Sequence, residues 1–591
     1  MCGIVGVRDD WLRRRGLDPA LAMRRAVDRL SWRGPDGRGH VRHGDWWLGC
    51  ARLAITQPGS SQPVVRRGGR LAAVLNGAIT NARELWAELL PAALRRRAPP
   101  NDAWLPLLAV ERDRRDLLAR LRGHHAFAVV DRDSGELVHG RDRYGEKPLF
   151  MLVDGPDDAV LAFASSLPAL RALGMPRPAA GARLWQLVRF GFAVPAPRTL
   201  DDGLRLMAAP RGASAAATPT ARGASATANL RQRLIASVDR CSDTTVAAGL
   251  FLSGGIDSSC LAAALRAIDR PLPAFQFRAD GAAGVERELA VAVAAHCRLP
   301  FHPVDGGPGV LDALPRLTLH AGMPLGDPSI LAVHAVARAA AATGIKVMLG
   351  GEGADELFFG YRRYAALRRL PRLPWLRRTA SRWGTGYFAR WWRAVTGDDP
   401  IAALLAVTPP AFAATVLAGS PDELDEDRSP YAGATPGHSL SRRARDADLD
   451  GYLRHDLLPK VDIATMAAGV EARCPYLEGE PDPTATVASD LGKRRLRAAF
   501  EGDLPARVFR QRKRGFSLPL DRWFRGDLPL LDLLRDRRTL DRPHLDAGGV
   551  GAAIDRHRRG GCDLGHGLYL LAAYEVFLRS QEQHDRESGD P

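Results

Sequence analysis

Residues 246–259, VAAGLFLSGGIDSS, run from an apolar stretch through a glycine-rich turn into a helix-forming segment. The stretch 246–252 has the length and composition of a buried strand. A second apolar stretch, 346–349, also ends in a glycine-rich turn, 350–353. Because buried strands that alternate with helices form parallel sheets, this half of the chain is predicted to be an α/β domain.

The turn after the first strand is predicted to bind phosphate. Gly254 and Gly255 allow a tight turn in which backbone N–H groups and serine hydroxyls face outward, and this geometry forms an anion cradle at a helix N-terminus. No lysine follows the second glycine as the G-x-x-x-x-G-K-[ST] loop requires, so a leaving pyrophosphate is the expected ligand. Asp257 is suited to bind Mg²⁺ among phosphate oxygens. The alternative is a glycine-rich turn that Asp257 only caps.

The acidic turn after the second strand is predicted to complete this site. Glu352 and Asp355 lie among glycines at the carboxyl end of the strand, where open α/β sheets place their ligands. Clustered acids repel each other unless a cation lies among them, which favours metal and pyrophosphate binding over a solvated acidic turn. The predicted ATP and pyrophosphate set is Leu252, Ser253, Gly254, Gly255, Asp257, Ser258, Gly350, Gly351, Glu352 and Lys513, with Asp257 and Asp355 as metal ligands.

Lysine is rare in this arginine-rich chain. The only lysines are Lys147, Lys346, Lys460, Lys493 and Lys513. Arginine's planar fork does not replace a point charge at a phosphate, so lysine is expected where a compact ammonium is needed, although chance retention is the alternative. Lys513 lies in the basic loop 510–516 and is predicted to supply countercharge as negative charge develops on departing phosphates.

The amino terminus carries a second candidate site. Removal of Met1 places a thiol and an α-amino group on one residue, Cys2, and the amine, with a reference pKa of about 7.7 to 8.0, can accept the thiol proton near neutral pH. An inert cysteine is the alternative for this position taken alone. Arg52 is predicted to grip a substrate carboxylate, and Asn76 with the N–H of Gly77 to form an oxyanion hole.

Short strands dominate the chain from position 2 to about position 200. The clearest apolar runs are 71–75, 126–131, 137–140, 149–153 and 160–164, and residues 133–135 supply a hairpin turn between two of them. Layered sheets flanked by helices are therefore expected. Residues 207–229 are too poor in large apolar side chains to cover a core and are predicted to be a linker, and the polar end, 580–591, is expected to fray.

Composition narrows the class of protein. An apolar fraction of 46% with 25% charged residues is typical of a soluble globular chain. No uncharged apolar stretch reaches about 18 residues and no signal peptide opens the chain, so a cytoplasmic protein without a membrane span is expected. Seven cysteines without clustered spacing argue against disulfides and zinc. The net charge of +16 is scattered and not interleaved with aromatic residues, so no nucleic-acid partner is expected.

Several motifs occur in a fixed order along the chain. They are CGIVG at 2–6, RGPD at 33–36, RLAI at 52–55, NG at 76–77, RDRYG at 141–145, SGGIDSS at 253–259 and EARCPYLE at 471–478. From Cys2 to about Arg579 the chain thereby resembles the glutamine-hydrolysing asparagine synthetases. The resemblance implies an α/β protein in which an N-terminal-nucleophile hydrolase α/β/β/α sandwich, the class II glutamine amidotransferase domain (2–206), precedes the linker. A parallel-sheet ATP-pyrophosphatase domain of the adenine nucleotide α-hydrolase-like type (230–579) follows it.

The resemblance also implies a reaction and roles for residues. In that family the first domain releases ammonia from glutamine, which travels through an internal tunnel to the second domain, where ATP has converted aspartate to β-aspartyl-AMP. By resemblance Cys2, Asn76, Gly77 and Lys513 are catalytic, and Arg52, Asn76 and Asp102 bind glutamine. ATP as a substrate and Mg²⁺ are the implied cofactors, and aspartate or another carboxylate is the acceptor. The sequence leaves a homodimer open.

This chain departs from the family pattern at several positions. The family reads Asn-Gly-Glu-Ile-Tyr-Asn where this chain has NGAITN at 76–81, so Asp102 remains as the main counter-ion for the α-ammonium of glutamine. Cys50 replaces a histidine and Gly350 replaces a serine. A ligase dedicated to another carboxylate, with weak glutaminase activity, is therefore an alternative, as is a regulatory or nucleic-acid-binding protein on a degenerate enzyme fold. The ATP-site residues oppose the latter.

Overall fold

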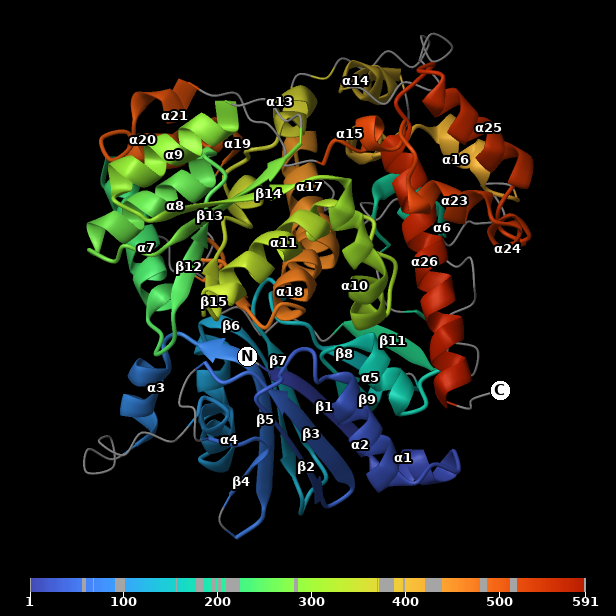
Figure 1. Cartoon of the computed structure of the whole chain (residues 1–591). Helices are drawn as coiled ribbons and strands as arrows, with labels where there is room; N and C mark the ends of the chain where they lie inside the picture. Colours follow the sequence, from blue (N-terminus) through green and yellow to red (C-terminus); the bar gives the residue numbers. More distant parts are fainter. Residues whose placement is uncertain are drawn as a thin grey trace.

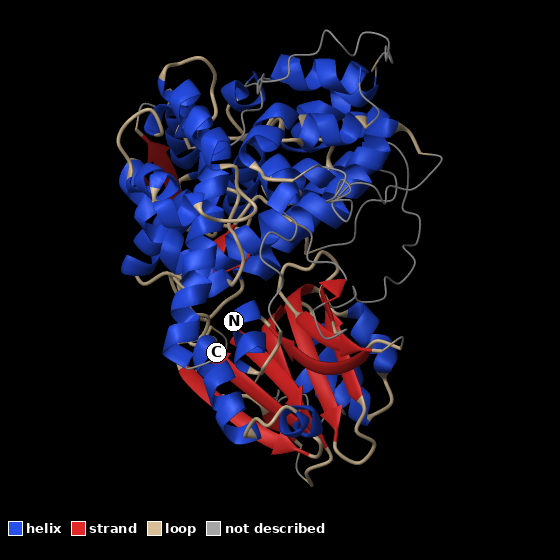
Figure 2. Ribbon diagram, turned by 90° about the vertical axis from the view of Figure 1, so that its right-hand side faces the viewer, coloured by secondary structure: helices blue, strands red, loops and turns tan. Residues whose placement is uncertain are grey.

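The computed structural model divides into a half built on antiparallel sheets and a half built on a parallel sheet (Figure 1). It describes residues 2–588 except 56–59, 67, 91–100, 156, 177–183, 194–197, 200–203, 209–223, 281–284, 369, 371–386, 397–398, 420–437, 479–485 and 511–517. Strands gather in one half of the molecule and helices dominate the other (Figure 2).

Two antiparallel sheets form the amino-terminal half. The seven-stranded sheet has the order β10-β11-β8-β9-β1-β3-β2 and the four-stranded sheet the order β4-β5-β6-β7. The strands are β1 (Cys2–Arg8), β2 (Gly37–His43), β3 (Trp46–Arg52), β4 (Val64–Val65), β5 (Leu71–Ile79), β6 (Gly123–Asp131), β7 (Leu137–Arg141), β8 (Phe150–Asp154), β9 (Ala159–Ala164), β10 (Arg198–Thr199) and β11 (Arg205–Ala208). Each of the five predicted strands is present, and the predicted turn at 133–135 joins β6 to β7.

The two sheets pack face to face with helices outside them. In β1, Cys2 and Ile4 point to the core between the sheets, whereas Val5 and Val7 point to the helices, as the two-residue period of a strand requires. Helices α2 (Pro19–Arg29) and α5 (Leu167–Ala172) cover the larger sheet, and α3 (Ala82–Leu89) and α4 (Trp104–Glu111) cover the smaller one. The predicted α/β/β/α sandwich is confirmed.

The carboxy-terminal half surrounds a parallel sheet of order β14-β13-β12-β15-β16. Its strands are β12 (Ala248–Phe251), β13 (Ala274–Ala279), β14 (Phe301–Gly306), β15 (Val347–Leu349) and β16 (Glu471–Arg473). Because β12 and β15 are neighbours, the two predicted glycine-rich turns leave the same edge of the sheet. The predicted parallel α/β domain is therefore confirmed.

The remaining elements are mostly helices of the carboxy-terminal half. They are α1 (Asp9–Arg14), the 3₁₀ helices Arg115–Arg120 and Pro308–Ala313, α6 (Leu184–Phe190), α7 (Ala224–Ser242), α8 (Ile256–Ala267), α9 (Val285–Cys297), α10 (Leu314–Ala321), α11 (Ser329–Ala342), α12 (Ala354–Leu357), α13 (Arg362–Arg368), α14 (Tyr387–Thr396), α15 (Pro400–Leu405), α16 (Pro410–Val416), α17 (Leu440–Ala447), the π-helix Asp448–Leu457, α18 (Leu458–Met466), α19 (Val487–Asp490), α20 (Arg494–Phe500), α21 (Ala506–Arg510), α22 (Leu520–Trp523), α23 (Pro529–Arg535), α24 (Arg537–Leu540), α25 (Ala547–Arg558) and α26 (Gly565–Ser588).

The ends of the predicted linker and tail differ from expectation. Strand β11 reaches Ala208 and α7 begins at Ala224, so both enter the stretch 207–229. Helix α26 continues to Ser588 through most of the segment expected to fray. Arg542, whose Nη1 lies 2.8 Å from Oε1 of Glu582, explains part of this extension, because it anchors the last turns of the helix.

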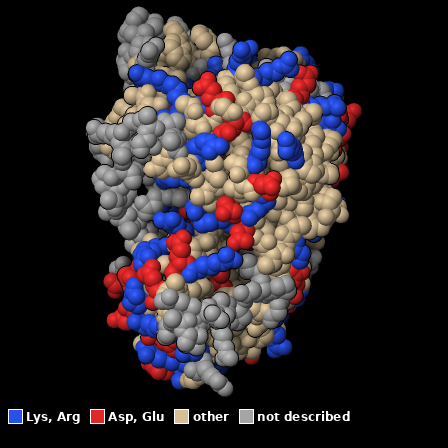
Figure 3. Space-filling view, turned by 90° about the vertical axis from the view of Figure 1, so that its left-hand side faces the viewer, with Lys and Arg blue, Asp and Glu red and all other residues tan. Residues whose placement is uncertain are grey.

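The surface charge is mixed. Arginine and carboxylate side chains alternate over the face drawn in Figure 3. Ion pairs at the surface of the protein include Arg115 with Glu136 and Arg231 with Asp503. None of the described helices has both the length and the apolar composition that a membrane-spanning helix requires.

A buried ion pair joins the two halves. Arg33, which precedes β2, donates from Nη1 and Nη2 to the two carboxylate oxygens of Asp462 in α18 at 2.7 and 3.0 Å. The side chains are 1% and 3% exposed. Lys147 Nζ lies 3.8 Å from the same carboxylate. One acid therefore compensates two buried cations of the other half.

We predict that Asp462→Ala lowers the free energy of unfolding by about 3–5 kcal/mol, because it removes the carboxylate that pairs with the buried guanidinium of Arg33 through two hydrogen bonds. Asp541→Ala is the matched control, since its partner Arg537 lies on the surface and the change should stay within about 0.5 kcal/mol. Urea denaturation of both variants measures the difference. Equal midpoints for the two would contradict the assigned importance of the buried pair.

Candidate active sites

Cys2 lies at the start of β1, inside the sandwich. Its side chain is 5% exposed, and its backbone N–H donates to Oδ1 of Asn76 at 3.2 Å. Arg52 lies directly opposite Cys2 on β3, and its Nη2 donates to Ser60 Oγ at 3.0 Å. The structure thus brings together three residues that are far apart in sequence and that were predicted to share a site.

Two further residues contact the thiol. Nε2 of Gln62 donates to Sγ of Cys2 at 3.6 Å, and hydrogen bonds in both directions with the backbone of Leu75 hold the Gln62 amide in place. A hydrogen bond with Cys50 lowers the pKa of the Cys2 thiol to about 7, and the charge of Arg52 acts in the same direction against burial. The sequence analysis did not assign Gln62, because a Gln-Pro pair in a loop carries no chemical signal of its own.

Strand β5 carries or contacts the other residues predicted to act on glutamine, Gly77 and Asp102. Gly77 has φ +110°, and a Cβ there would lie 1.9 Å from the carbonyl oxygen of His124, so only glycine fits. Asp102 accepts a hydrogen bond from the N–H of Ile79 at 2.9 Å, and burial raises the pKa of its carboxyl group. Asp102 therefore contacts the residue that follows Ala78, and position 78 is where the family pattern has glutamate.

The first glycine-rich turn closes on itself through its serines. Ser258 Oγ accepts from the backbone N–H of Ser253 at 3.1 Å, and Ser253 Oγ accepts from the N–H of Gly255 at 3.2 Å. Gly254 has φ +81°, which strains any other residue. Helix α8 begins directly after the turn, so its free N–H groups face the space in front of the sheet.

A cavity of about 740 Å³ lies in front of both turns. Ser253 and Ser258 line it from the first turn, and Glu352 lines it from the second. The predicted residues on its wall are Leu252, Ser253, Gly255, Asp257, Ser258, Gly351, Glu352 and Asp355. Most of the predicted nucleotide set therefore lies around one space; Gly254 and Gly350 do not line it, and Lys513 lies outside the described residues.

Lys493 compensates the two predicted metal ligands. Its Nζ lies 2.5 Å from Oδ1 of Asp257 and 2.7 Å from Oδ1 of Asp355. Burial lowers the pKa of this lysine, but the two carboxylates outweigh that effect and raise it. Burial, with Asp355 nearby, raises the pKa of Glu356 to about 7. Asp257 and Asp355 thus share one compact cation at this wall of the cavity.

The other described lysines also contact carboxylates. Lys460 Nζ lies 3.0 Å from Asp327 and lines the cavity, whereas Lys346 pairs with Asp36 at 3.0 Å away from it. Lys147 belongs to the interface between the halves. Each of the four described lysines therefore forms an ion pair, and two of them, Lys460 and Lys493, lie at the cavity.

The replacement of serine by Gly350 has a local explanation. A Cβ at this position would lie 2.2 Å from Oε2 of Glu352, whose side chain folds back over the glycine. Burial raises the pKa of this carboxyl group. Gly350 therefore leaves room for the Glu352 carboxylate, which the side chain of a serine would displace.

Fold and sites together define a two-site protein: a sandwich with a buried cysteine at its first strand, joined to an α/β domain with a nucleotide-sized cavity. Comparison with known proteins agrees with this class. Residues 1–220 match the family profile described as a glutamine amidotransferase domain, and residues 229–579 match the profile described as asparagine synthase. The chain belongs to the glutamine-hydrolysing asparagine synthetase family. Its members are glutamine-dependent, ATP-using ligases that form carbon–nitrogen bonds, and this chain is an enzyme of that class.

Individual relatives cover most of the chain. A putative glutamine-hydrolysing asparagine synthetase of Mycobacterium tuberculosis is 30% identical over 95% of this chain and 94% of its own length. Asparagine synthetase 1 of Bacillus subtilis is 26% identical over 89% of this chain and 88% of its own. Amidase chyE of Penicillium rubens is 26% identical over 58% of this chain and 55% of its own.

We predict that Cys50→Ala raises the pKa of the Cys2 thiol, because the hydrogen bond from Cys50 is the largest contribution that lowers it. Only the thiolate is alkylated, so labelling of Cys2 by iodoacetamide should rise through pH 7 in the unaltered protein and at higher pH in the variant. Mass spectrometry of the Cys2 peptide gives both profiles. Cys562→Ala, which changes a distant cysteine, should leave the profile in place; a shift there, or none in Cys50→Ala, would contradict the assignment.

Proposed function

We propose that this enzyme hydrolyses glutamine at Cys2 and uses the ammonia to amidate a carboxylate that ATP has activated as an adenylate, with release of AMP and pyrophosphate. Aspartate is the first candidate acceptor. The observation that carries the proposal is the cavity that joins the serine-rich turn at the N-terminus of α8 to the acidic turn after β15. Such an arrangement suits a nucleotide whose phosphates lie against helix N–H groups.

In the glutamine half-reaction, the α-amine of processed Cys2 takes the thiol proton and the thiolate attacks the side-chain amide. Asn76 and Gly77 then stabilise the oxyanion. Arg52 holds the substrate carboxylate and Asp102 its ammonium. The raised pKa of Asp102 favours this role, because burial disfavours its charged form and the ammonium of a bound glutamine would stabilise that form.

In the synthetase half-reaction, the turn 253–258 holds the pyrophosphate portion of ATP. Asp257 and Asp355 supply the carboxylate oxygens that a divalent cation prefers, and they lie close enough together to share one cation, the Lys493 ammonium. Within the described part of the chain no group of three His, Cys, Asp or Glu side chains could hold a metal ion, and Asp257 and Asp355 are the two residues that would hold Mg²⁺. Mg²⁺ supplies neutralisation of phosphate charge, and Lys513 is proposed to add to it as pyrophosphate leaves.

A ligase that amidates a different carboxylate is the second candidate. The likeness to Amidase chyE and the altered position Gly350, next to Glu352, favour it. Incubation with ATP and a panel of carboxylic acids, with pyrophosphate release as the readout, distinguishes the candidates. Aspartate-dependent release supports the first, and release with another acid but not aspartate supports the second.

We predict that Cys2→Ala loses amide formation from glutamine and retains it from ammonium, because the two half-reactions use separate sites. Asp257→Asn should lose both, since it removes charge from the pyrophosphate site. Amide yield with each nitrogen source measures the difference. Equal loss of both activities in Cys2→Ala would contradict the two-site assignment.

We also predict that Ala78→Glu lowers the KM for glutamine about tenfold, because it restores a charge-assisted hydrogen bond of about 1.5 kcal/mol to the α-ammonium. Ala78→Gln, which has the same size without the charge, is the matched control and should lower the KM much less. The rate with ammonium is the internal reference. Similar effects of the two substitutions would rule out charge as the cause.

A further inference from the structure

One short segment touches both proposed active sites. Residues 471–478, EARCPYLE, form β16 and the turn after it, and we call them the bridging segment. The carbonyl oxygen of Arg473 accepts from the N–H of Gly350 at 2.9 Å, and the hydroxyl of Tyr476 donates to the carbonyl oxygen of Asp257 at 2.9 Å. The middle of the segment is therefore bonded to both turns that line the cavity.

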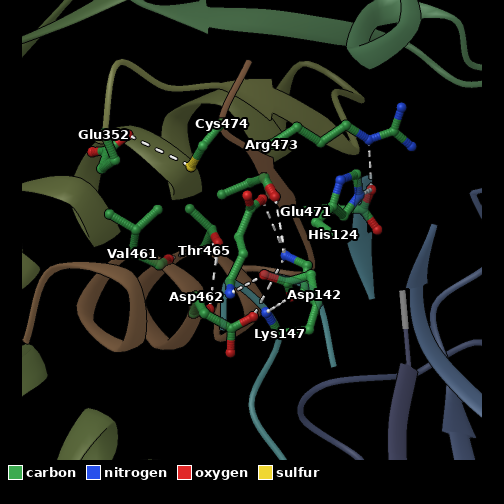
Figure 4. A network of polar contacts seen from close by, with 12 residues as sticks. His124, Asp142, Lys147, Glu352, Val461, Asp462, Thr465, Glu471, Arg473 and Cys474 are labelled. Atoms are coloured by element: carbon green, nitrogen blue, oxygen red, sulfur yellow. Dashed lines mark hydrogen bonds and ion pairs between the residues drawn. The ribbon is translucent and has the colours of Figure 1, made fainter. Parts of the chain in front are cut away.

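The same segment packs tightly behind the acidic turn. Leu477 lies so close to Gly353 that a Cβ there would be 2.2 Å from Leu477 Cδ2. The thiol of Cys474 lies 4.0 Å from Oε2 of Glu352 (Figure 4). A displacement of either cavity turn is thus transmitted to the bridging segment, because close-packed groups have no free space to absorb it.

The first end of the bridging segment reaches the amino-terminal half. Oε1 of Glu471 lies 2.9 Å from Nε2 of His124 on β6 and 2.6 Å from Nε of Arg473 (Figure 4). Burial lowers the pKa of His124 to about 4, so a neutral imidazole donates to the carboxylate. His124 pairs directly with Ala78 on β5. This end of the bridging segment therefore contacts β6, the neighbour of β5, and β5 carries residues predicted to act on glutamine.

The second end contacts β5 at the residue after its last position. Oγ1 of Thr80 donates to Oε1 of Glu478 at 2.7 Å. Glu478 is 6% exposed, and its carboxylate also accepts from Arg240 and Ser237 of α7, which fix its direction. Thr80 follows Ile79, whose N–H donates to Asp102. The family pattern has tyrosine at position 80, so a contact made by a threonine hydroxyl at this position departs from that pattern.

We propose that Glu478 and Glu471 are positioning residues for the glutamine half-reaction: acting through Thr80 and His124, they hold residues 76–79 at the end of β5, and Thr80 after them, in place. The inference rests on the proposed function. The bridging segment is also hydrogen-bonded to the turns at Gly350 and Asp257. A ligand that shifts these turns therefore also shifts the contacts that hold β5. Glutamine is then cleaved efficiently only when the synthetase site is correctly arranged, which limits wasted glutamine.

Thr80→Val tests this inference, because it removes one hydroxyl and keeps the shape of the side chain. Thr245→Val is the matched control: Oγ1 of Thr245 also donates between the halves, to the carbonyl oxygen of Ile55 at 2.8 Å, but outside the bridging segment. Three quantities are measured in the full-length protein: the KM for glutamine, the amide-forming rate with ammonium, and the ratio of glutamate formed to pyrophosphate released.

Thr80→Val should raise the KM for glutamine about tenfold, the lower end of the effect of a hydrogen bond to a charged group, since Arg240 still compensates Glu478. It should also raise the ratio of glutamate to pyrophosphate, while the rate with ammonium is retained. Thr80→Ser should restore both values because it restores the hydroxyl, and Thr245→Val should change neither.

Three outcomes overturn the inference: unchanged glutamine kinetics and ratio in Thr80→Val, the same change in Thr245→Val, or parallel loss of glutamine- and ammonium-dependent rates in Thr80→Val, which indicates a purely structural role. Failure of the proposed function is distinguishable from these. In that case the unaltered protein forms no amide from either nitrogen source with any acid of the panel.

Discussion

The arrangement of the two halves depends on buried charge that is compensated across the interface between them. Asp462 of α18 faces Arg33 and Lys147, both from the sandwich, in a region closed to water. Ion pairs removed from water gain stability only when their geometry is well matched, so such a pair specifies one relative placement more than it adds stability. The distance between the Cys2 site and the cavity follows from that placement.

The interface continues this pattern toward the cavity. Glu471 lies among His124 and Arg473, and its pKa is lowered well below the ordinary value because burial is outweighed by the guanidinium of Arg473. At the cavity wall, Lys493 forms ion pairs with Asp257 and Asp355, as Arg33 does with Asp462 at the interface. These buried acids are each paired with a cation in fixed geometry, and Arg33 and Lys493 come from distant parts of the chain.

The departures from the family pattern have structural counterparts. Cys50, in place of a histidine, provides the hydrogen bond that lowers the pKa of Cys2. Gly350, in place of a serine, makes room for the Glu352 carboxylate. Thr80, in place of a tyrosine, reaches Glu478 in the other half. These substitutions adjust both sites and the contact between them, while the sheets that carry the sites keep the order expected of the family fold.

The sequence by itself determined the fold class and the main strands, and it predicted the residues of both sites, because these depend on local patterns: apolar runs of strand length, glycines at tight turns, and motifs in order. It did not predict where some elements end. Helix α26, for example, continues to Ser588, and its last turns are held by the distant Arg542. Only the tertiary structure decided which residues surround the predicted ones. Gln62 reaches Cys2, Lys493 reaches Asp257, and Glu478 reaches Thr80 across 60, 236 and 398 positions of sequence. Such pairings arise from how the sheets and helices pack, and no local spacing encodes them.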